Sequence, residues 1–559
     1  MGRPNRCITS SSLSAWSISV AAALISLLGL APRLGADPAA HRMAATSEHP
    51  VVTSVALSIL RRGGSAVDAA VAATLAAGVV SPMSSGLGGG GFALWYDSAL
   101  ASAEFWDFRE TAPRRIDPRQ LARKDRDRSG RHGALIGVPG EPRGLFELHR
   151  CHGRLAWREL VEPAARLALE GYPAGPHLVR AVGRLRNGRP RGRVVMRSLG
   201  FPWHGMAVGL VLFRPRLGRT LKAYQAEGPD AITHGAIARD LVSATHKHGG
   251  TLSLDDLAEY RPVLRAPLST QWGNLRVLTA PPPSAGGLLL AQTLGTFSKQ
   301  DLRNHASREK RLGLLSQSFL ASFEDRRRYV GDPARVDMDL EALLDPARLA
   351  ARRRSFDQPV PATPVTLVPD HGTHHLAVVD ARGDIVSLTT TINHSFGVRV
   401  VAPLSGIVLN DELDDFSTRT KSDPGDFSSD PNRPAPRVRP VSSMSPTLVL
   451  DRAGPRWVLG GSGGMAISTN VTQVLIALSV DGIDPQDAVD APRFLVNPAT
   501  GALRVEPGFD PDAVDALRRR GIPVEFIDRT MTAVQLLART DGGWQAVADP
   551  RKFGSGGTE

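Results

Sequence analysis

The segment richest in groups that could do chemistry spans residues 371–393. It opens with His-Gly-Thr-His-His at 371–375 and closes with Ser-Leu-Thr-Thr-Thr-Ile-Asn at 387–393. Three histidines this close are candidate metal ligands, but they lack a helical spacing and a nearby cysteine. In a strand, His374 and His375 would point to opposite faces. The sequence therefore predicts no metal centre in this segment.

A second candidate is the glycine run at 84–91, which reads Ser-Ser-Gly-Leu-Gly-Gly-Gly-Gly. It lacks the Lys-Ser/Thr ending of a phosphate-binding P-loop, and it lacks the strand-before, helix-after setting of a dinucleotide fold. A strand, Phe92–Tyr96, follows it. The run predicts close backbone packing around a pocket rather than a phosphate cradle.

The surrounding elements mix helices and strands. Residues 51–80 predict a helix, a break at Gly63-Gly64 and a buried, alanine-rich helix. Further helical patterns cover 140–181, 236–248 and 310–329, and the arginine-rich stretch 184–193 predicts an irregular connection. After residue 371, strands are predicted at 376–380, 385–391 and 447–450. The long Ser/Asp/Pro-rich connection 417–440, whose one aromatic is Phe427, predicts either a lid or a disordered crossing loop.

The composition is that of a folded protein, with 42% hydrophobic and 22% charged residues in 559, which excludes full disorder. The net charge of +12 could attract a polyanion, but no nucleic-acid motif accompanies it and aromatic residues make up only 5%. A solvated basic surface is the preferred interpretation. A polyanion-binding surface protein stays the last alternative, and no nucleic-acid partner is expected.

The N-terminus predicts export. Arg3 and Arg6 precede an uncharged run from Cys7 to Pro32 with a strongly apolar centre. A positive segment followed by an apolar one is typical of a signal peptide. Residues 1–36 are therefore predicted to be a signal peptide or, if uncleaved, a membrane anchor. The expected location is periplasmic or secreted.

The string at 371–393 resembles the gamma-glutamyltransferase family, whose members are N-terminal-nucleophile hydrolases made as one precursor and cut into two chains. The resemblance extends from about residue 49 to residue 550. Six further strings carry it in family order, at 61–70, 107–113, 281–287, 409–416, 439–447 and 490–493.

The resemblance implies an α+β fold, a four-layer αββα sandwich built jointly by a large segment, 37–372, and a small segment, 373–559. It also implies that cleavage between Gly372 and Thr373 makes Thr373 the nucleophile. An alcohol needs a nearby base, and a free α-amino group with a pKa near 8 can serve. Thr391 is expected to hydrogen-bond Thr373 and support its orientation.

The same resemblance assigns the substrate contacts. Arg109 would grip the donor α-carboxylate through two hydrogen bonds, assisted by Ser442 and Ser443. The donor ammonium would meet Asp415, Glu412 and the side-chain carbonyl of Asn393. Backbone amides of Gly463 and Gly464 would hold the oxyanion.

Two departures from the family pattern stand near the site. His374 replaces a small hydroxyl residue after the nucleophile, and Ser462 stands where a proline usually precedes the two glycines. His374 could alter maturation or donor preference, and Ser462 could loosen the turn.

The implied function is an exported, self-processed gamma-glutamyltransferase and glutathione hydrolase. It needs no cofactor, and it transfers a γ-glutamyl group from an amide donor to water or to an amino-acid or peptide acceptor. Two alternatives remain open: a related acylase acting on a cephalosporin or on poly-γ-glutamate, and a catalytically impaired member of the family.

Overall fold

The computed structural model describes residues 42–121, 133–188, 192–304, 308–357, 371–417, 430–528 and 532–559. The predicted export segment 1–36 and half of the connection 417–440, residues 418–429 with Phe427, lie outside these residues. Within the described ranges, no helix combines the length and apolar character needed to cross a bilayer.

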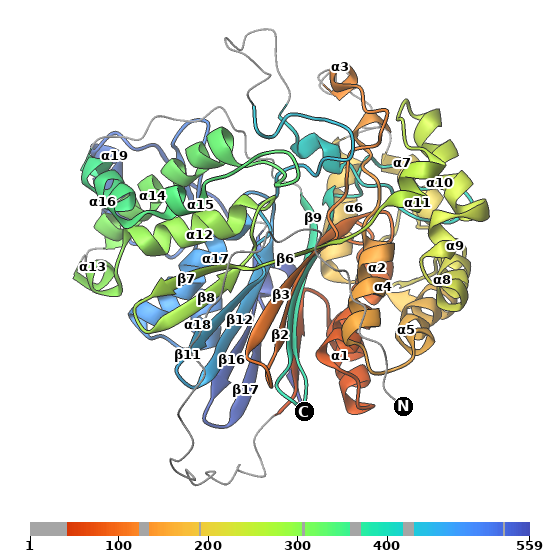
Figure 1. The fold of residues 1–559 in the computed structure, drawn as a ribbon, viewed down its shortest axis with the longest axis horizontal. Helices are drawn as coiled ribbons and strands as arrows, with labels where there is room; N and C mark the ends of the chain where they lie inside the picture. The colour runs from red at the N-terminus through yellow and green to blue at the C-terminus, as the bar shows by residue number, and fades with distance from the viewer. Residues whose placement is uncertain are drawn as a thin grey trace, which may run out of the picture.

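Two sheets pack face to face at the centre of the molecule (Figure 1). The first has seven strands, and all its neighbouring strands are antiparallel. Its order is β18 (Ser555–Thr558), β1 (Ala44–Ser47), β9 (His371–Val379), β10 (Ile385–His394), β2 (Gly90–Asp97), β3 (Ser102–Asp107) and β6 (Val263–Arg265).

The second sheet has six strands, also antiparallel throughout. Its order is β17 (Gly543–Val547), β16 (Ala533–Thr540), β12 (Gly454–Ser462), β11 (Thr447–Asp451), β8 (Leu275–Thr279) and β7 (Leu268–Trp272). Strands β12 and β16 contact β9 across the interface between the sheets. Two smaller sheets lie outside this pair: β13 (Phe494–Val496), β14 (Leu503–Val505) and β15 (Val524–Phe526), and β4 (Tyr172–Pro173) with β5 (Val211–Leu212).

Helices cover both outer faces (Figure 1). On the seven-stranded sheet, α2 contacts β9 and β10, and α1, α4 and α5 pack against α2. The helices on this side are α1 (Pro50–Arg61), α2 (Ala66–Val80), α3 (Pro118–Leu121), α4 (Glu141–His152), α5 (Trp157–Glu170), α6 (Pro176–Gly188), α7 (Gly192–Leu199), α8 (Pro215–Glu227), α9 (Asp230–Thr233), α10 (Gly235–Lys247) and α11 (Leu254–Glu259).

On the six-stranded sheet, α17 packs on β12 and β16, and α12 packs on β7 and α17. The helices on this side are α12 (Ala285–Thr296), α13 (Lys299–Asn304), α14 (Arg308–Tyr329), α15 (Leu340–Leu344), α16 (Pro346–Arg354), α17 (Ala466–Ile476), α18 (Pro485–Asp490) and α19 (Pro511–Arg519). The order helix, sheet, sheet, helix confirms the predicted αββα sandwich.

The alternation of β9 divides its side chains between two cores. Leu376 and Val378 lie in the core under α2, whereas Ala377 and Val379 lie in the core between the sheets. Because successive strand residues face opposite sides, this pattern fixes which way each neighbouring active-site residue points.

The glycine run packs backbone against backbone, as its sequence predicts. A Cβ added to Gly89 would lie 2.1 Å from the carbonyl oxygen of Thr391, and one added to Gly91 would lie 2.2 Å from that of Thr389. Larger residues at these positions would push β10 out of place.

One prediction about the arginine-rich stretch 184–193 was wrong. Residues 184–188 belong to α6 and residues 192–193 begin α7, so the described part of this stretch is helical rather than an irregular connection. Leu178, Val182 and Leu185 form a buried stripe on α6, and this stripe outweighs the loop-like appearance of the arginines.

The helix that packs on β9, α2, depends on a buried carboxylate. Asp68 completes the capping box of α2 with Ser65. Its Oδ2 also accepts hydrogen bonds from the backbone amides of Arg154 at 2.9 Å and Leu155 at 3.0 Å. Asp68 therefore joins the start of α2 to the turn between α4 and α5.

We expect Asp68→Ala to lower the free energy of unfolding by about 2 kcal/mol or more, because it leaves buried amides without acceptors. Thermal unfolding followed by circular dichroism should show a lower Tm. Asp541→Ala, in the exposed turn between β16 and β17, is the control. An unchanged Tm for Asp68→Ala would contradict this role.

Candidate active site

Thr373 and Thr391 lie directly opposite each other on β9 and β10. Their hydroxyl oxygens are 3.1 Å apart, and the Thr391 hydroxyl donates to the carbonyl oxygen of Gly372 at 2.9 Å. The backbone amide of Asn393 donates to the same Thr391 oxygen at 2.9 Å. The Thr391 hydroxyl has one proton, which it donates to the Gly372 carbonyl. The Thr373 hydroxyl therefore donates its own proton to the Thr391 oxygen. Thr373 and Thr391 therefore form the hydrogen bond that the sequence analysis expected.

A bulge follows Thr391. The register of β9 and β10 shifts between Thr391 and Asn393, and Asn393 has a φ of +68°. Asparagine tolerates this left-handed conformation better than most residues. The Asn393 side-chain amide donates to the carbonyl oxygen of Asp411 at 3.1 Å, which leaves its own carbonyl oxygen as an acceptor.

His374 and His375 point to opposite faces, as predicted. The His375 ring lies between the sheets, 2.8 Å from the Thr389 hydroxyl, and a Cβ added to Gly460 would lie 2.2 Å from it. Burial lowers the pKa of His375 to about 3. Burial, followed by repulsion from His49, lowers the pKa of His374 well below its ordinary value. Both rings are neutral at physiological pH. Among the described residues, no three His, Cys, Asp or Glu side chains form a group that could hold a metal ion.

Arg109 is the centre of a buried polar cluster and is 1% exposed. Its Nε donates to the Pro440 carbonyl at 2.6 Å, and Nη2 donates to the Val441 carbonyl at 3.0 Å and to Asp415 at 2.6 Å. Its Nη1 forms an ion pair with Glu412. The Asp415 side chain is 31% exposed and that of Glu412 only 1%. Asp415 is therefore the partner with room to change places with a ligand.

Glu110 belongs to the same cluster, although the sequence analysis did not single it out. It is fully buried, and neither carboxylate oxygen has a hydrogen-bonding partner in another residue of the described part of the chain. Burial, followed by repulsion from Glu412, raises the pKa of Glu110 well above its ordinary value. Burial also raises the pKa of Glu412 to about 7, against the opposing effect of Arg109. The position of Glu110 directly after Arg109 in the sequence is the signal that could have identified it.

Ser442 and Ser443 follow the two carbonyl groups that hold Arg109 and are 2% and 9% exposed. The Ser442 backbone is fixed against the start of α12, because its amide donates to the Pro283 carbonyl at 2.9 Å and its carbonyl accepts from the Ala285 amide at 2.9 Å. Both serines therefore lie in the segment that directly follows the carbonyl groups bound by Arg109.

Gly463 and Gly464 form the turn between β12 and α17, with φ values of +127° and +62°. Side chains rarely adopt this conformation, and a Cβ on Gly463 would lie 2.3 Å from Thr532. The preceding Ser462 accepts a hydrogen bond from Lys552, whose Nζ is also 3.5 Å from the Thr373 carbonyl oxygen. The turn is thereby tied to the nucleophile strand, and its amides lie just before the positive end of a helix dipole.

His394, at the end of β10, is a second residue that the sequence analysis missed. Its Nδ1 lies 2.9 Å from an Asp411 carboxylate oxygen, and its backbone amide donates to the other oxygen at 2.9 Å. Burial lowers its pKa, but Asp411, Asp414 and Asp415 outweigh burial and raise it to about 9. His394 is therefore cationic at neutral pH and offsets the acidic segment that carries Glu412 and Asp415.

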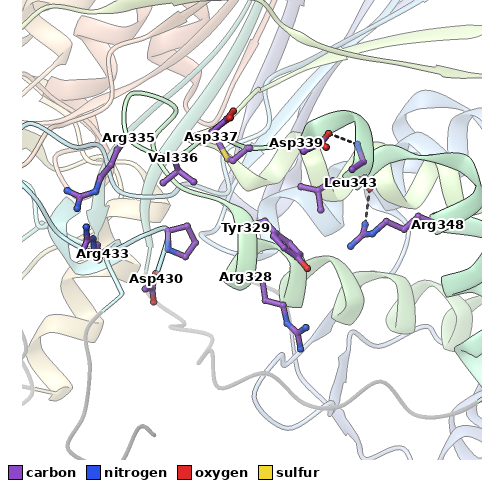
Figure 2. A pocket seen from close by; sticks show the side chains of 13 residues that line it. Arg328, Tyr329, Arg335, Val336, Asp337, Asp339, Leu343, Arg348, Asp430 and Arg433 are labelled. Atoms are coloured by element: carbon purple, nitrogen blue, oxygen red, sulfur yellow. Dashed lines mark hydrogen bonds between the residues drawn. The ribbon is translucent and has the colours of Figure 1, made fainter. Parts of the chain in front are cut away.

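A surface pocket of about 600 Å³ borders the segment after this cluster (Figure 2). Asn432, between the lining residues Pro431 and Arg433, donates to the Asp415 carbonyl at 2.8 Å and accepts from the Val441 amide at 3.0 Å. The other residues that line the pocket are Arg328, Tyr329, Arg335, Val336, Asp337, Met338, Asp339, Ala342, Leu343, Arg348 and Asp430. Charges of both signs line the pocket, so the lining gives no preference for an anion or a cation.

Comparison with known proteins identifies the family. The model of the gamma-glutamyltranspeptidase family matches residues 52–558. Glutathione hydrolase 2 of Arabidopsis thaliana is 35% identical over 79% of this chain and 78% of its own length. The glutathione hydrolase proenzyme of Escherichia coli is 31% identical over 89% of this chain and 88% of its own.

Solved structures give the same result. A cephalosporin acylase from Bacillus halodurans superposes with a TM-score of 0.80 at 26% identity, covering 93% of this chain and 96% of that one. A gamma-glutamyltranspeptidase chain from Pseudomonas nitroreducens, complexed with L-DON, is 30% identical with a TM-score of 0.50, covering 56% of this chain and 96% of that one. With the family model matching most of its length, the chain belongs to the gamma-glutamyltranspeptidase family.

Proposed function

We propose that this protein is a gamma-glutamyltransferase and glutathione hydrolase that matures by cutting itself between Gly372 and Thr373. The observation that carries the proposal is the position of the Thr391 hydroxyl, which contacts both the Thr373 hydroxyl and the Gly372 carbonyl. The glutathione hydrolases among its relatives support the substrate class.

Self-cleavage begins with attack by Thr373 Oγ1 on the Gly372 carbonyl carbon. The new C–O bond forms, the C–N bond breaks and the threonine amide nitrogen takes the proton, so that an ester replaces the peptide bond. Thr391 donates to the carbonyl oxygen on which negative charge develops. Water then hydrolyses the ester, leaving a carboxylate on Gly372 and a free amine on Thr373.

Turnover uses the amine that cleavage releases. At neutral pH it accepts the Thr373 hydroxyl proton while the oxygen attacks the γ-carbonyl of the donor. Backbone amides of Gly463 and Gly464 stabilise the oxyanion. The leaving amine, which is cysteinylglycine when the donor is glutathione, takes the proton. Water or an acceptor amine then removes the γ-glutamyl group from Thr373.

Donor binding is an exchange of partners around Arg109. Its nitrogens are already engaged by Glu412, Asp415 and two carbonyl groups. The donor α-carboxylate takes the place of the part-exposed Asp415, and Ser442 and Ser443 add donors. Asp415, thus released, meets the α-ammonium together with Glu412 and the Asn393 carbonyl. The donor brings one charge of each sign, so its binding leaves the net charge of the cluster unchanged.

Cleavage leaves two chains, 37–372 and 373–559, that cannot separate without unfolding. In the first sheet β1 lies between β18 and β9, and β2 pairs with β10; in the second, β8 pairs with β11. Each sheet therefore contains strands from both segments. The segment 1–36 directs the precursor to the periplasm or the exterior, and the protein is membrane-attached only if that segment is retained.

A related acylase is the second candidate, because the superposition with the cephalosporin acylase is extensive. A glutaryl group lacks the α-ammonium that Asp415 and Glu412 would bind in the proposed donor complex. Hydrolysis of γ-glutamyl-p-nitroanilide well above that of glutaryl-p-nitroanilide supports the transferase, and the reverse preference supports the acylase.

Thr373→Ala should remain a single chain without activity, because it lacks the attacking oxygen. Thr391→Val keeps the shape of residue 391 but removes its hydroxyl, and it should slow self-cleavage at least about tenfold. A denaturing gel followed over time measures both. Thr540→Val, on β16, is the matched control. A cut and active Thr373→Ala protein would overturn the assignment.

Asp415→Asn should raise KM for γ-glutamyl-p-nitroanilide about tenfold, because the ammonium loses its charged partner. The rate with the glutaryl substrate should change little. Steady-state kinetics on both substrates, with the exposed-site variant Asp515→Asn for comparison, checks this. Equal losses on both substrates would argue against recognition of the ammonium.

The folded protein should lose stability as the pH rises through about 9, where His394 gives up its proton. A group whose pKa is raised by folding stabilises the protein fully below its unfolded value and loses that effect above its folded value. Tm measured from about pH 6 to about pH 10 should therefore fall more for the wild type than for His394→Gln. Parallel curves for the two proteins would contradict this assignment.

A further inference from the structure

A buried lysine lies on the opposite side of the nucleophile strand from Thr391. Lys552, near the C-terminal end of the chain, is 2% exposed. Its Nζ donates to the Ser462 hydroxyl, lies 3.5 Å from the Thr373 carbonyl oxygen and is 3.4 Å from a carboxylate oxygen of Glu48. A buried ammonium needs such partners, so its position is defined on three sides.

Glu48 completes the arrangement. Its other carboxylate oxygen accepts the backbone amide of His375 at 3.1 Å, and it is 4% exposed. Burial raises the pKa of Glu48, and the charge of Lys552 opposes that rise. Lys552 and Glu48 therefore form an ion pair whose two members each bond to the backbone of β9.

The reason for this pair lies in the length of β1. Pairing between β1 and β9 ends at Ser47 and Leu376, so the backbone of Thr373 and His375 extends beyond the end of its neighbour. In a strand, the backbone carbonyl of one residue and the backbone amide of the residue two positions later point to the same edge. Lys552 and Glu48 thus replace the missing strand, one bonding to the Thr373 carbonyl and the other to the His375 amide.

We propose that Lys552 is a positioning residue for the reaction, holding the nucleophile and the oxyanion turn at a fixed separation through Thr373 and Ser462. The inference rests on the proposed function. Lys552 contacts no reacting atom. Once the Gly372–Thr373 bond is cut, Thr373 becomes a chain end, and unrestrained chain ends fray. The lysine keeps that end in place.

The hydrogen bond from Lys552 also suggests a role for the Ser462 hydroxyl. The sequence places a serine where a turn-stiffening proline is usual, and its hydroxyl, buried at 0% exposure, is the acceptor for Lys552. The hydrogen bond restores a restraint on the turn that leads to Gly463 and Gly464. Lys552 and Ser462 should therefore act as one unit.

The experiment is a double-mutant cycle on the full chain with Lys552→Met, Ser462→Ala and the double variant. Lys552→Met keeps the apolar stem and removes the ammonium. With γ-glutamyl-p-nitroanilide we expect kcat to fall at least about tenfold in Lys552→Met while KM stays within about threefold. Ser462→Ala should lower kcat less, and the double variant should be no slower than Lys552→Met. Lys222→Met, at a surface ion pair on α8, is the matched control.

The outcomes separate the two proposals. A wild-type protein that neither cuts itself nor hydrolyses the substrate overturns the proposed function and this inference with it. An active wild type with an unchanged kcat in Lys552→Met, or with additive losses in the cycle, overturns the positioning role alone. If Lys552→Met does not fold, Ser462→Ala decides: a lower kcat at an unchanged KM and Tm supports the role, and an unchanged kcat overturns it.

Discussion

The active site depends on one bridging hydroxyl, that of Thr391. Its position follows from the register that sets β10 against β9 and from the bulge that returns the Asn393 amide to the same oxygen. The backbone of Gly89 closes on the Thr391 carbonyl from the neighbouring strand. Every hydrogen-bonding position of the hydroxyl is filled, so rotation of Thr373 would break a buried hydrogen bond, at a cost of about 1 kcal/mol or more. The proposed nucleophile is thus held by the sheet itself rather than by a loop.

Electrostatics organises the other half of the site. Arg109 meets more buried carboxyl groups than it can neutralise, and burial leaves Glu110 and Glu412 with raised pKa values. His394 supplies a second cation behind the acidic segment. In the proposed donor complex, a zwitterionic head group would bring one charge of each sign into this arrangement. We therefore expect the cluster to discriminate against ligands that lack an ammonium.

Local sequence patterns correctly predicted the elements that depend mainly on neighbouring residues. The alanine-rich α2, the alternation of β9 and the glycine run all lie where their sequences indicate. The helices α6 and α7 were missed because an arginine-rich sequence is typical of an exposed loop, and the buried apolar residues of α6 are evident only in the structure. Arg109 and Thr373 were found through strings shared with a family. Glu110, His394 and Lys552 were not, because their environments depend on contacts between distant parts of the chain.

The order of strands in the first sheet also bears on when maturation can occur. The strand β1 is held between β9 and β18, and Lys552 reaches Thr373 from the residues just before β18. The surroundings of Thr373 are thus assembled from strands that lie far apart in the sequence, and they exist only once the sheet has formed around β1. We therefore expect the proposed cut to follow folding of the sheet, so that an unfolded precursor stays uncut.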